Sequence, residues 1–240
     1  MFFKNVLLMI LLSVIFISCT KELKQDNVIS VSVLPQKYFI ERIVGDKFDV
    51  NVVIPPGSSP ATYEPTPANL ISLSHSPLYF RIGYIGFEKA WMEKIASVNP
   101  KMKVVDTSKN VELITSDHHH EGKEKVGVNP HIWLSPSAVK IQAENIYNAI
   151  KIYDEKNEEF YTKNYESFIN DLDKLNMQIK MMLKDIPNRK FIVYHPAWSY
   201  FARDYDLIQI PIEFEGKNPS PKTIKNIIDV AIKENIKVVI

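Results

Sequence analysis

Residues 155–184 read EKNEEFYTKNYESFINDLDKLNMQIKMMLK and contain neither glycine nor proline. Their apolar side chains recur at alternating steps of three and four residues, the spacing that places side chains on one face of an α-helix. The pattern ends before Pro187 and comprises Tyr165, Phe168, Leu172, Leu175, Ile179, Met182 and Ile186. A helix of this length spans roughly 45 Å, so we predict a rigid strut that joins two lobes. The alternative is an ordinary long helix within one domain.

The chain before this helix alternates between strand and helix patterns. Strands are predicted at 29–34, 48–54, 78–82 and 103–106, and helices at 37–44, 69–74, 87–96 and from Pro136 onward, with Ser135 as the cap. Strands that alternate with helices predict a parallel sheet covered by helices on its faces. Between these elements we expect a proline-stiffened loop at 57–67 and a polar loop at 116–128.

The chain after the long helix repeats the alternation. Strands are predicted at 191–194, 207–210 and 237–240, and helices at 197–205 and 223–234. We therefore expect an α/β protein of two parallel-sheet lobes, with the N-terminal lobe at 29–153, the linking helix at 154–187 and the C-terminal lobe at 188–240. Because no helix follows the last strand to cover it, we expect the C-terminal lobe to be truncated.

The composition is that of an ordinary globular protein and excludes several functions. Of 240 residues, 45% are hydrophobic and 24% are charged, and the net charge is +1. A charge this close to zero gives no electrostatic reason to expect a nucleic-acid partner. The chain also has no Gly-x-Ser-x-Gly elbow, no phosphate-binding glycine loop and no His-Glu-x-x-His motif, so the known catalytic motifs do not favour an enzyme.

The first residues have the pattern of a secretion signal. An apolar run at 6–17 follows Lys4 and is too short to span a bilayer comfortably. It ends in Phe16-Ile17-Ser18-Cys19, which resembles the bacterial lipoprotein cleavage box. We predict a signal peptide at 1–18, lipidation of Cys19 and a polar tether at 19–28. Cys19 is the only cysteine, so an intrachain disulfide is impossible. A plain secretion signal or an uncleaved anchor is the alternative.

Two histidines stand in matching surroundings, one in each predicted lobe. His131 lies in Asn129-Pro130-His131-Ile132-Trp133, and His195 lies in Tyr194-His195-Pro196. Imidazole is the commonest metal ligand among side chains. Both histidines fall at ends of predicted strands or starts of helices, where open α/β sheets bind ligands. We therefore predict a metal held between the lobes. The alternative for either residue is a packed or surface histidine.

A third group of histidines lies in the polar loop. The tract His118-His119-His120 has the composition of a metal-binding segment. It could concentrate metal beside the cleft, supply a ligand directly, or be a polar loop without a role. We expect His75 to be a surface residue.

Several motifs occur together in one order along the chain. They are the box at Cys19, TYEPTP at 62–67, NPHIWLSP at 129–136, the long helix, YHP at 194–196 and GKNPSP at 216–221. Taken together, they resemble the zinc/manganese substrate-binding lipoproteins of bacterial ABC importers. The resemblance runs from about Ile29 to Ile240. It implies two α/β lobes joined by a rigid helix, metal in the cleft and an ABC permease as partner.

The resemblance also assigns ligand positions. The family has three histidine positions and a late carboxylate, and His131 matches the second position and His195 the third. A histidine at the third position is typical of the zinc branch, whereas manganese relatives more often have glutamate there. The first position holds Ala61 here, and the late carboxylate would lie beyond Ile240. We hypothesise that the 118–120 tract replaces the missing ligand.

Two carboxylates are alternative donors, Glu64 beside the substituted position and Glu213 after His195. A third class of function, a zinc hydrolase, would require three protein ligands and a bound water.

These observations predict a solute-binding protein without catalytic activity. We expect a monomer, lipid-anchored in the cell envelope and facing the periplasm or exterior, which captures Zn²⁺, or Mn²⁺ or another divalent ion, for a permease. Neutral imidazole ligands make binding weaken as pH falls through a pKa near roughly 6.5. The runner-up is a surface adhesin on the same scaffold that does not deliver metal.

Overall fold

The computed structural model describes residues 27–118, 125–213 and 218–240, and it describes no side chain between 116 and 126. The predicted signal peptide, Cys19, His119 and His120 lie outside the described residues. The first described strand begins at Val28, the last residue of the predicted tether at 19–28.

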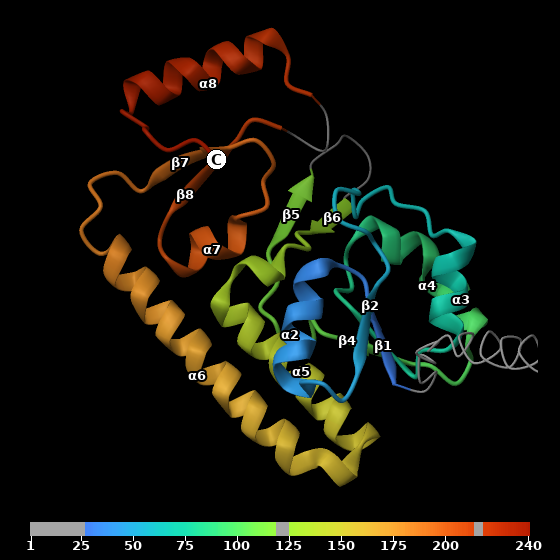
Figure 1. Cartoon of the computed structure of the whole chain (residues 1–240). Helices are drawn as coiled ribbons and strands as arrows, with labels where there is room; N and C mark the ends of the chain where they lie inside the picture. Colours follow the sequence, from blue (N-terminus) through green and yellow to red (C-terminus); the bar gives the residue numbers. More distant parts are fainter. Residues whose placement is uncertain (1–26, 119–124, 214–217) are drawn as a thin grey trace, which may run out of the picture.

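The N-terminal lobe is built on a parallel sheet, as predicted. Its strands are β1 (Val28–Val31), β2 (Asp49–Val52), β3 (Leu78–Arg81) and β4 (Lys103–Asp106), in the order β2-β1-β3-β4 (Figure 1). The chain leaves β1 in one direction to form β2 and returns on its other side to form β3. The carboxyl end of β1 is therefore a topological switch point, where such sheets bind ligands.

Helices cover both faces of this sheet because alternate strand residues point to opposite sides. Leu78 and Phe80 pack with α2 (Leu34–Val44), α5 (Pro136–Tyr153) and the long helix, whereas Tyr79 packs in the opposite core. That second core is closed by α3 (Pro67–Ser74) and α4 (Gly86–Val98).

Proline and a capping side chain define several helix starts. Pro136 stands in the first turn of α5, and the Ser135 hydroxyl accepts from the Ala138 N–H at 3.0 Å, which confirms the predicted cap. Thr66 caps α3 in the same way. These hydroxyls satisfy backbone N–H groups that have no partner within the helix.

The long helix, α6 (Glu158–Leu183), follows a short 3₁₀ turn at Glu155–Asn157. Its first half belongs to the N-terminal lobe, since Tyr161, Phe168 and Leu172 are buried in the core beside α2 and α5. Its second half runs on to the C-terminal lobe (Figure 1). The helix therefore combines the two predicted alternatives: it is packed in one lobe and leads to the other.

The predicted apolar face of this helix is partly confirmed in its second half, where Ile179 and Ile186 are half-buried but two other predicted residues are not. Leu175 and Met182 are 43% and 78% exposed, whereas Asn176 and Leu183, one position further along, are half-buried. At 3.6 residues per turn the contact face drifts around a straight helix, and here it passes through positions 176, 179, 183 and 186.

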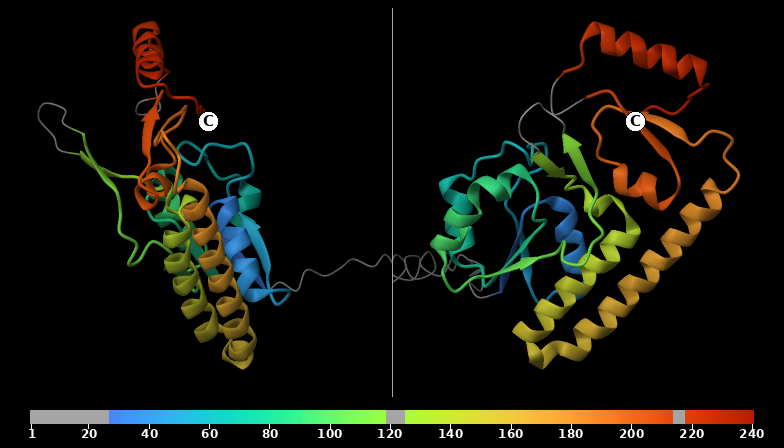
Figure 2. Two further views of the ribbon diagram at one scale, coloured as in Figure 1. Left: turned by 90° about the vertical axis from the view of Figure 1, so that its left-hand side faces the viewer. Right: turned by 180° about the vertical axis from the view of Figure 1, so that it is seen from behind.

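The predicted polar loop at 116–128 contains two strands instead. β5 (Thr115–His118) and β6 (Lys125–Val128) form an antiparallel pair in which Thr115 lies opposite Val128. Alternation of Val126 and Val128 with polar residues is too short a signal to distinguish a hairpin from a loop. Both strands stand out from the body of the molecule (Figure 2). A 3₁₀ turn, η1 (Ile132–Leu134), connects this hairpin to α5.

The C-terminal lobe has a small parallel sheet. β7 (Lys190–Val193) pairs with β8 (Ile208–Pro211) on one side and with the segment 238–240 on the other, through hydrogen bonds such as Ile240 N to Ile192 O at 2.9 Å. Helices α7 (Ser199–Asp204) and α8 (Pro221–Lys233) make the crossovers. Val238, Val239 and Ile240 are more than half exposed.

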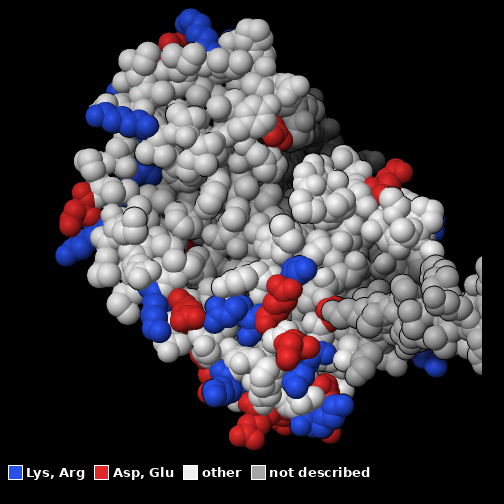
Figure 3. Space-filling model, viewed as in Figure 1, with Lys and Arg blue, Asp and Glu red and all other residues white. Residues whose placement is uncertain are grey.

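The described residues contain no candidate membrane span, and charges of both signs mix on one face of the molecule. Among the described residues, no helix combines the length and the apolar composition that crossing a bilayer requires. On the face in Figure 3, Lys, Arg, Asp and Glu mix over the end of the N-terminal lobe where α5 and α6 meet. Mixed charge of this kind does not favour a polyanionic partner.

Replacing a side chain by alanine is expected to affect stability differently in the two halves of α6. Phe168→Ala is expected to lower the free energy of unfolding by about 3–5 kcal/mol, because it empties a buried site beside Phe39. Met181→Ala, at a side chain that is 64% exposed, is expected to change it by no more than about 0.5 kcal/mol. Urea denaturation followed by circular dichroism measures both. Equal losses would contradict this division of the helix.

Candidate metal centre

His131 is held at the end of the N-terminal lobe by its neighbours in sequence. Ile132 is fully buried in the second core, and the ring of Trp133 packs against the imidazole with centroids 5.1 Å apart. Pro130 precedes it, and the 3₁₀ turn and the Ser135 cap follow. The apolar residues of the motif therefore anchor the backbone and leave the half-buried imidazole at the surface of the lobe.

His195 is presented by the other lobe in a similar way. β7 is buried through Val193, and the chain then turns at His195 and Pro196 toward α7. The His195 side chain is 52% exposed. The histidine thus stands just beyond the carboxyl end of the central strand of its sheet, as the sequence predicted.

The two imidazoles meet. Their Nε2 atoms are 3.3 Å apart and their ring centroids 5.0 Å apart. Two nitrogens that each bind a tetrahedral Zn²⁺ at about 2.05 Å are themselves about 3.3 Å apart. The observed separation therefore equals the spacing that one zinc ion would require from two of its ligands.

Hydrogen bonding directs the lone pairs of both rings toward this meeting point. Asn129 Oδ1 lies 2.9 Å from His131 Nδ1, and the carboxylate oxygens of Glu213 lie 3.3 Å from His195 Nδ1. Because an amide oxygen and a carboxylate only accept, the proton belongs on Nδ1 in each ring. The Nε2 lone pair is then available for a metal, and outer partners of this kind raise ligand basicity.

The pKa of His131 favours metal binding. Burial, and then the neighbouring His195, lower this pKa from 6.5 to about 4. His131 is therefore neutral at physiological pH. This ring therefore stays neutral well below the pH of roughly 6.5 at which an unperturbed imidazole gains its proton.

The two predicted carboxylate donors do not reach the shared Nε2 position, and the structure does not describe the side chains of the 118–120 tract. Glu64 is exposed and forms no hydrogen bond or ion pair with either imidazole in the part of the chain described. Glu213 contacts Nδ1 of His195, away from the shared Nε2 position. The backbone of His118 ends β5, but its side chain lies outside the description, as do His119 and His120. His75 is exposed at the end of α3, as predicted.

The described residues thus offer a site made of two histidines. Among them, no group of three or more His, Cys, Asp or Glu side chains is arranged to hold a metal ion. A closed zinc site uses four ligands, so two positions around the expected ion are left for other donors.

The loop that carries Ala61 is pinned to the start of α4. The Phe87 N–H donates to the Pro60 carbonyl at 2.9 Å, and a Cβ at Gly86 would come within 2.3 Å of the Ala61 carbonyl oxygen. Only glycine fits at that contact. Position 61 therefore has a fixed backbone and an exposed side chain.

A buried carboxylate holds the turn before α4. Glu88 is 2% exposed, and its oxygens accept from the backbone N–H of Ile82 at 2.8 Å, from Gly83 and from the Ser32 hydroxyl. Burial raises the pKa of Glu88. The sequence analysis missed this residue, because a glutamate within a helical pattern reads as solvated.

Side chains of α7 hold the two lobes together beside the histidines. Tyr200 is fully buried in the N-terminal lobe, and its hydroxyl donates to the Asn129 carbonyl at 2.7 Å. Arg203 donates to the Glu112 carbonyl at 2.8 Å, and the Ser135 hydroxyl donates to Asp204. The sequence analysis missed all these contacts, since nothing in a short helix indicates which side chains cross to another lobe.

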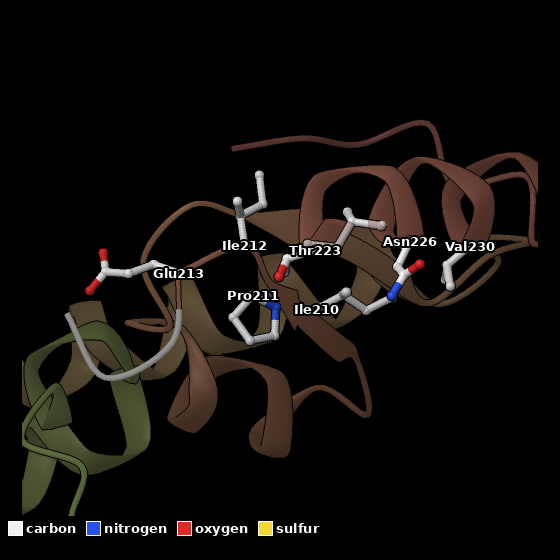
Figure 4. A pocket seen from close by; sticks show the side chains of 8 residues that line it. Ile210, Pro211, Ile212, Glu213, Thr223, Asn226 and Val230 are labelled. Atoms are coloured by element: carbon white, nitrogen blue, oxygen red, sulfur yellow. The ribbon is translucent and has the colours of Figure 1, made fainter. Parts of the chain in front are cut away.

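A separate cavity lies in the C-terminal lobe, away from the shared Nε2 position. It has a volume of about 470 Å³ between β8 and α8 and is lined mainly by apolar residues such as Ile210, Ile227 and Val230. Glu213 stands at one end with its carboxylate turned away from the other lining side chains (Figure 4). The cavity therefore borders the residue that contacts His195 but offers no further ligand.

Known proteins share the sequence pattern and the fold of this chain. The family described as "ZnuA: Zinc-uptake complex component A periplasmic" matches residues 29–240. This chain belongs to the ZnuA family. Its members are metal-binding substrate-binding proteins of ABC transporters, which work with a membrane permease and are not enzymes. The hydrolase alternative is therefore wrong, and the α/β fold inferred from the sequence is confirmed.

Individual relatives carry different metals in their names. The chain is 29% identical to the high-affinity zinc uptake system protein ZnuA of Bacillus subtilis over 220 residues, which is 85% of this chain and 67% of that protein. It is 32% identical to the manganese ABC transporter substrate-binding lipoprotein PsaA of Streptococcus mitis over 203 residues, 79% of this chain and 63% of that protein. A crystal structure of ZnuA superposes with a TM-score of 0.81 at 42% identity and covers 87% of this chain and 79% of that one.

The lowered pKa of His131 predicts how stability depends on pH. Between about pH 6.5 and 4 the unfolded chain binds a proton at this residue that the folded chain does not. This contribution to stability is thus complete above pH 6.5 and is lost as pH falls toward 4. NMR titration of the metal-free protein should give a midpoint near 4 for His131. In His195→Ala the midpoint should rise but stay below 6.5, because burial is the larger cause; a midpoint of 6.5 in the unaltered protein would contradict this.

Proposed function

We propose that this ZnuA-family chain captures Zn²⁺ between His131 and His195 and delivers it to an ABC permease. The observation that carries the proposal is the 3.3 Å separation of the two Nε2 atoms, with an acceptor on each Nδ1. Imidazole donors suit zinc, whereas manganese favours carboxylate and carbonyl oxygens. Zinc is therefore the preferred cargo, and manganese or another divalent ion is the alternative.

The remaining ligands stay a prediction. We propose that a histidine of the 118–120 tract takes the place that Ala61 leaves vacant. The tract begins at His118, the last residue of β5, and β6 ends three residues before His131. Water can occupy any position that the protein leaves open, which would weaken binding but allow release.

The place of action follows from the sequence and from the relatives. Family members are periplasmic or lipoprotein substrate-binding proteins. We propose that the signal at 1–18 directs export, that Cys19 carries the lipid, and that the monomeric chain acts on the outer side of the membrane. Globomycin treatment of cells that express the protein would cause the uncleaved precursor to accumulate if Cys19 is the lipidation site.

Zinc titration of the tag-free protein tests the two-histidine site. His131→Ala and His195→Ala should each lower the affinity by more than the roughly 10–100-fold that loss of an outer partner costs, because each removes one of two described ligands. A chromophoric chelator in competition measures the affinity. His75→Ala, an exposed histidine outside the site, is the matched control and should bind as the unaltered protein does.

The same titration separates the remaining donors and metals. Replacing His118, His119 and His120 together by alanine should lower the affinity if the tract supplies a ligand, and unchanged affinity would reject it. Titration with Mn²⁺ should give weaker binding than Zn²⁺. Full affinity in both single variants at 131 and 195 would overturn the proposal.

A further inference from the structure

Asn129 contacts both halves of the molecule with one side chain. Its Oδ1 accepts from the backbone N–H of His131 at 3.0 Å and lies 2.9 Å from Nδ1 of the same residue. Its Nδ2 donates to the Ser199 hydroxyl at 3.0 Å and faces the Pro196 carbonyl at 3.4 Å. The amide oxygen thus contacts the histidine of the N-terminal lobe, and the amide nitrogen contacts the turn that follows His195.

The orientation of this amide is determined by chemistry. The Pro196 carbonyl is only an acceptor and the backbone N–H of His131 is only a donor. If the amide were rotated by 180°, its oxygen would face the Pro196 carbonyl oxygen, and its NH₂ group would face the backbone N–H of His131. Neither pair could form a hydrogen bond. Oδ1 must therefore face His131, and the imidazole must carry its proton on Nδ1.

The contact continues into the sheet of the C-terminal lobe. The Ser199 hydroxyl also accepts from Nε2 of Gln209 at 3.1 Å, and Oε1 of Gln209 accepts from the Trp198 N–H at 2.8 Å. Gln209 belongs to β8. A hydrogen-bonded chain therefore leads from the imidazole of one lobe to the sheet of the other and passes through Asn129.

We infer that Asn129 is a positioning residue that fixes the tautomer of His131 and, through Ser199, sets the distance between the two imidazoles. The inference rests on the proposed function, because it assigns Asn129 a role toward a metal that His131 and His195 bind. Tautomer and distance are both conditions for binding: Nε2 must present a lone pair, and the two Nε2 atoms must stand at the spacing that one ion requires. A residue that met only one condition would leave the site incomplete.

Variants of Asn129 separate these two tasks. Asn129→Leu removes both contacts. Asn129→Asp keeps an acceptor for Nδ1 of His131 but loses the donor to Ser199. Ser199→Ala removes the shorter of the two contacts to the other lobe and leaves the histidine contact in place. The matched control is Asn145→Leu, because the Asn145 amide donates to the carbonyls of Thr107 and Lys109 within the N-terminal lobe.

Two measurements test the inference. ¹⁵N NMR of histidine-labelled, metal-free protein at neutral pH reports the tautomer: we expect His131 to carry its proton on Nδ1 in the unaltered protein, Asn129→Asp and Ser199→Ala, and to shift toward Nε2 in Asn129→Leu. Zinc affinity should fall by about 10–100-fold in Asn129→Leu, by less in the other two variants, and not at all in Asn145→Leu.

The outcomes are distinguishable. An unchanged tautomer in Asn129→Leu, an affinity equal to that of the unaltered protein, or an equal loss in Asn145→Leu would overturn the positioning role. If the unaltered protein binds no zinc but its tautomer shifts in Asn129→Leu, the hydrogen bond to His131 is supported and the proposed function fails.

Discussion

The insertion of Tyr200 into the N-terminal lobe is the contact on which the site depends. The ring is buried in the core beneath the sheet, and its hydroxyl accepts from the Ile114 N–H at 3.1 Å and donates to the Asn129 carbonyl at 2.7 Å. A buried phenol with both partners satisfied is costly to withdraw. This contact anchors α7 of the C-terminal lobe to the N-terminal lobe, and the Asn129–Ser199 hydrogen bond and the 3.3 Å approach of the two imidazoles lie beside it.

The fold could largely be predicted because its signals are local. Alternating strand and helix patterns identified β1 to β4 and β7 to β8, and Ser135 and Pro136 marked the start of α5. Features that depend on packing between distant elements were not predicted. The face of α6 shifts from Leu175 to Asn176 beyond the N-terminal lobe, and periodicity alone carries no information about which neighbour a helix turn meets.

The candidate site shows the same division. His131 and His195 were identified from their surroundings in sequence, and the structure brings them together. The contacts of Asn129 with His131 and of Glu213 with His195 Nδ1 depend on side-chain direction across lobes, which no motif specifies. Glu213 was predicted as a metal ligand, and its position instead suits an acceptor that orients the ring, a role we propose for it.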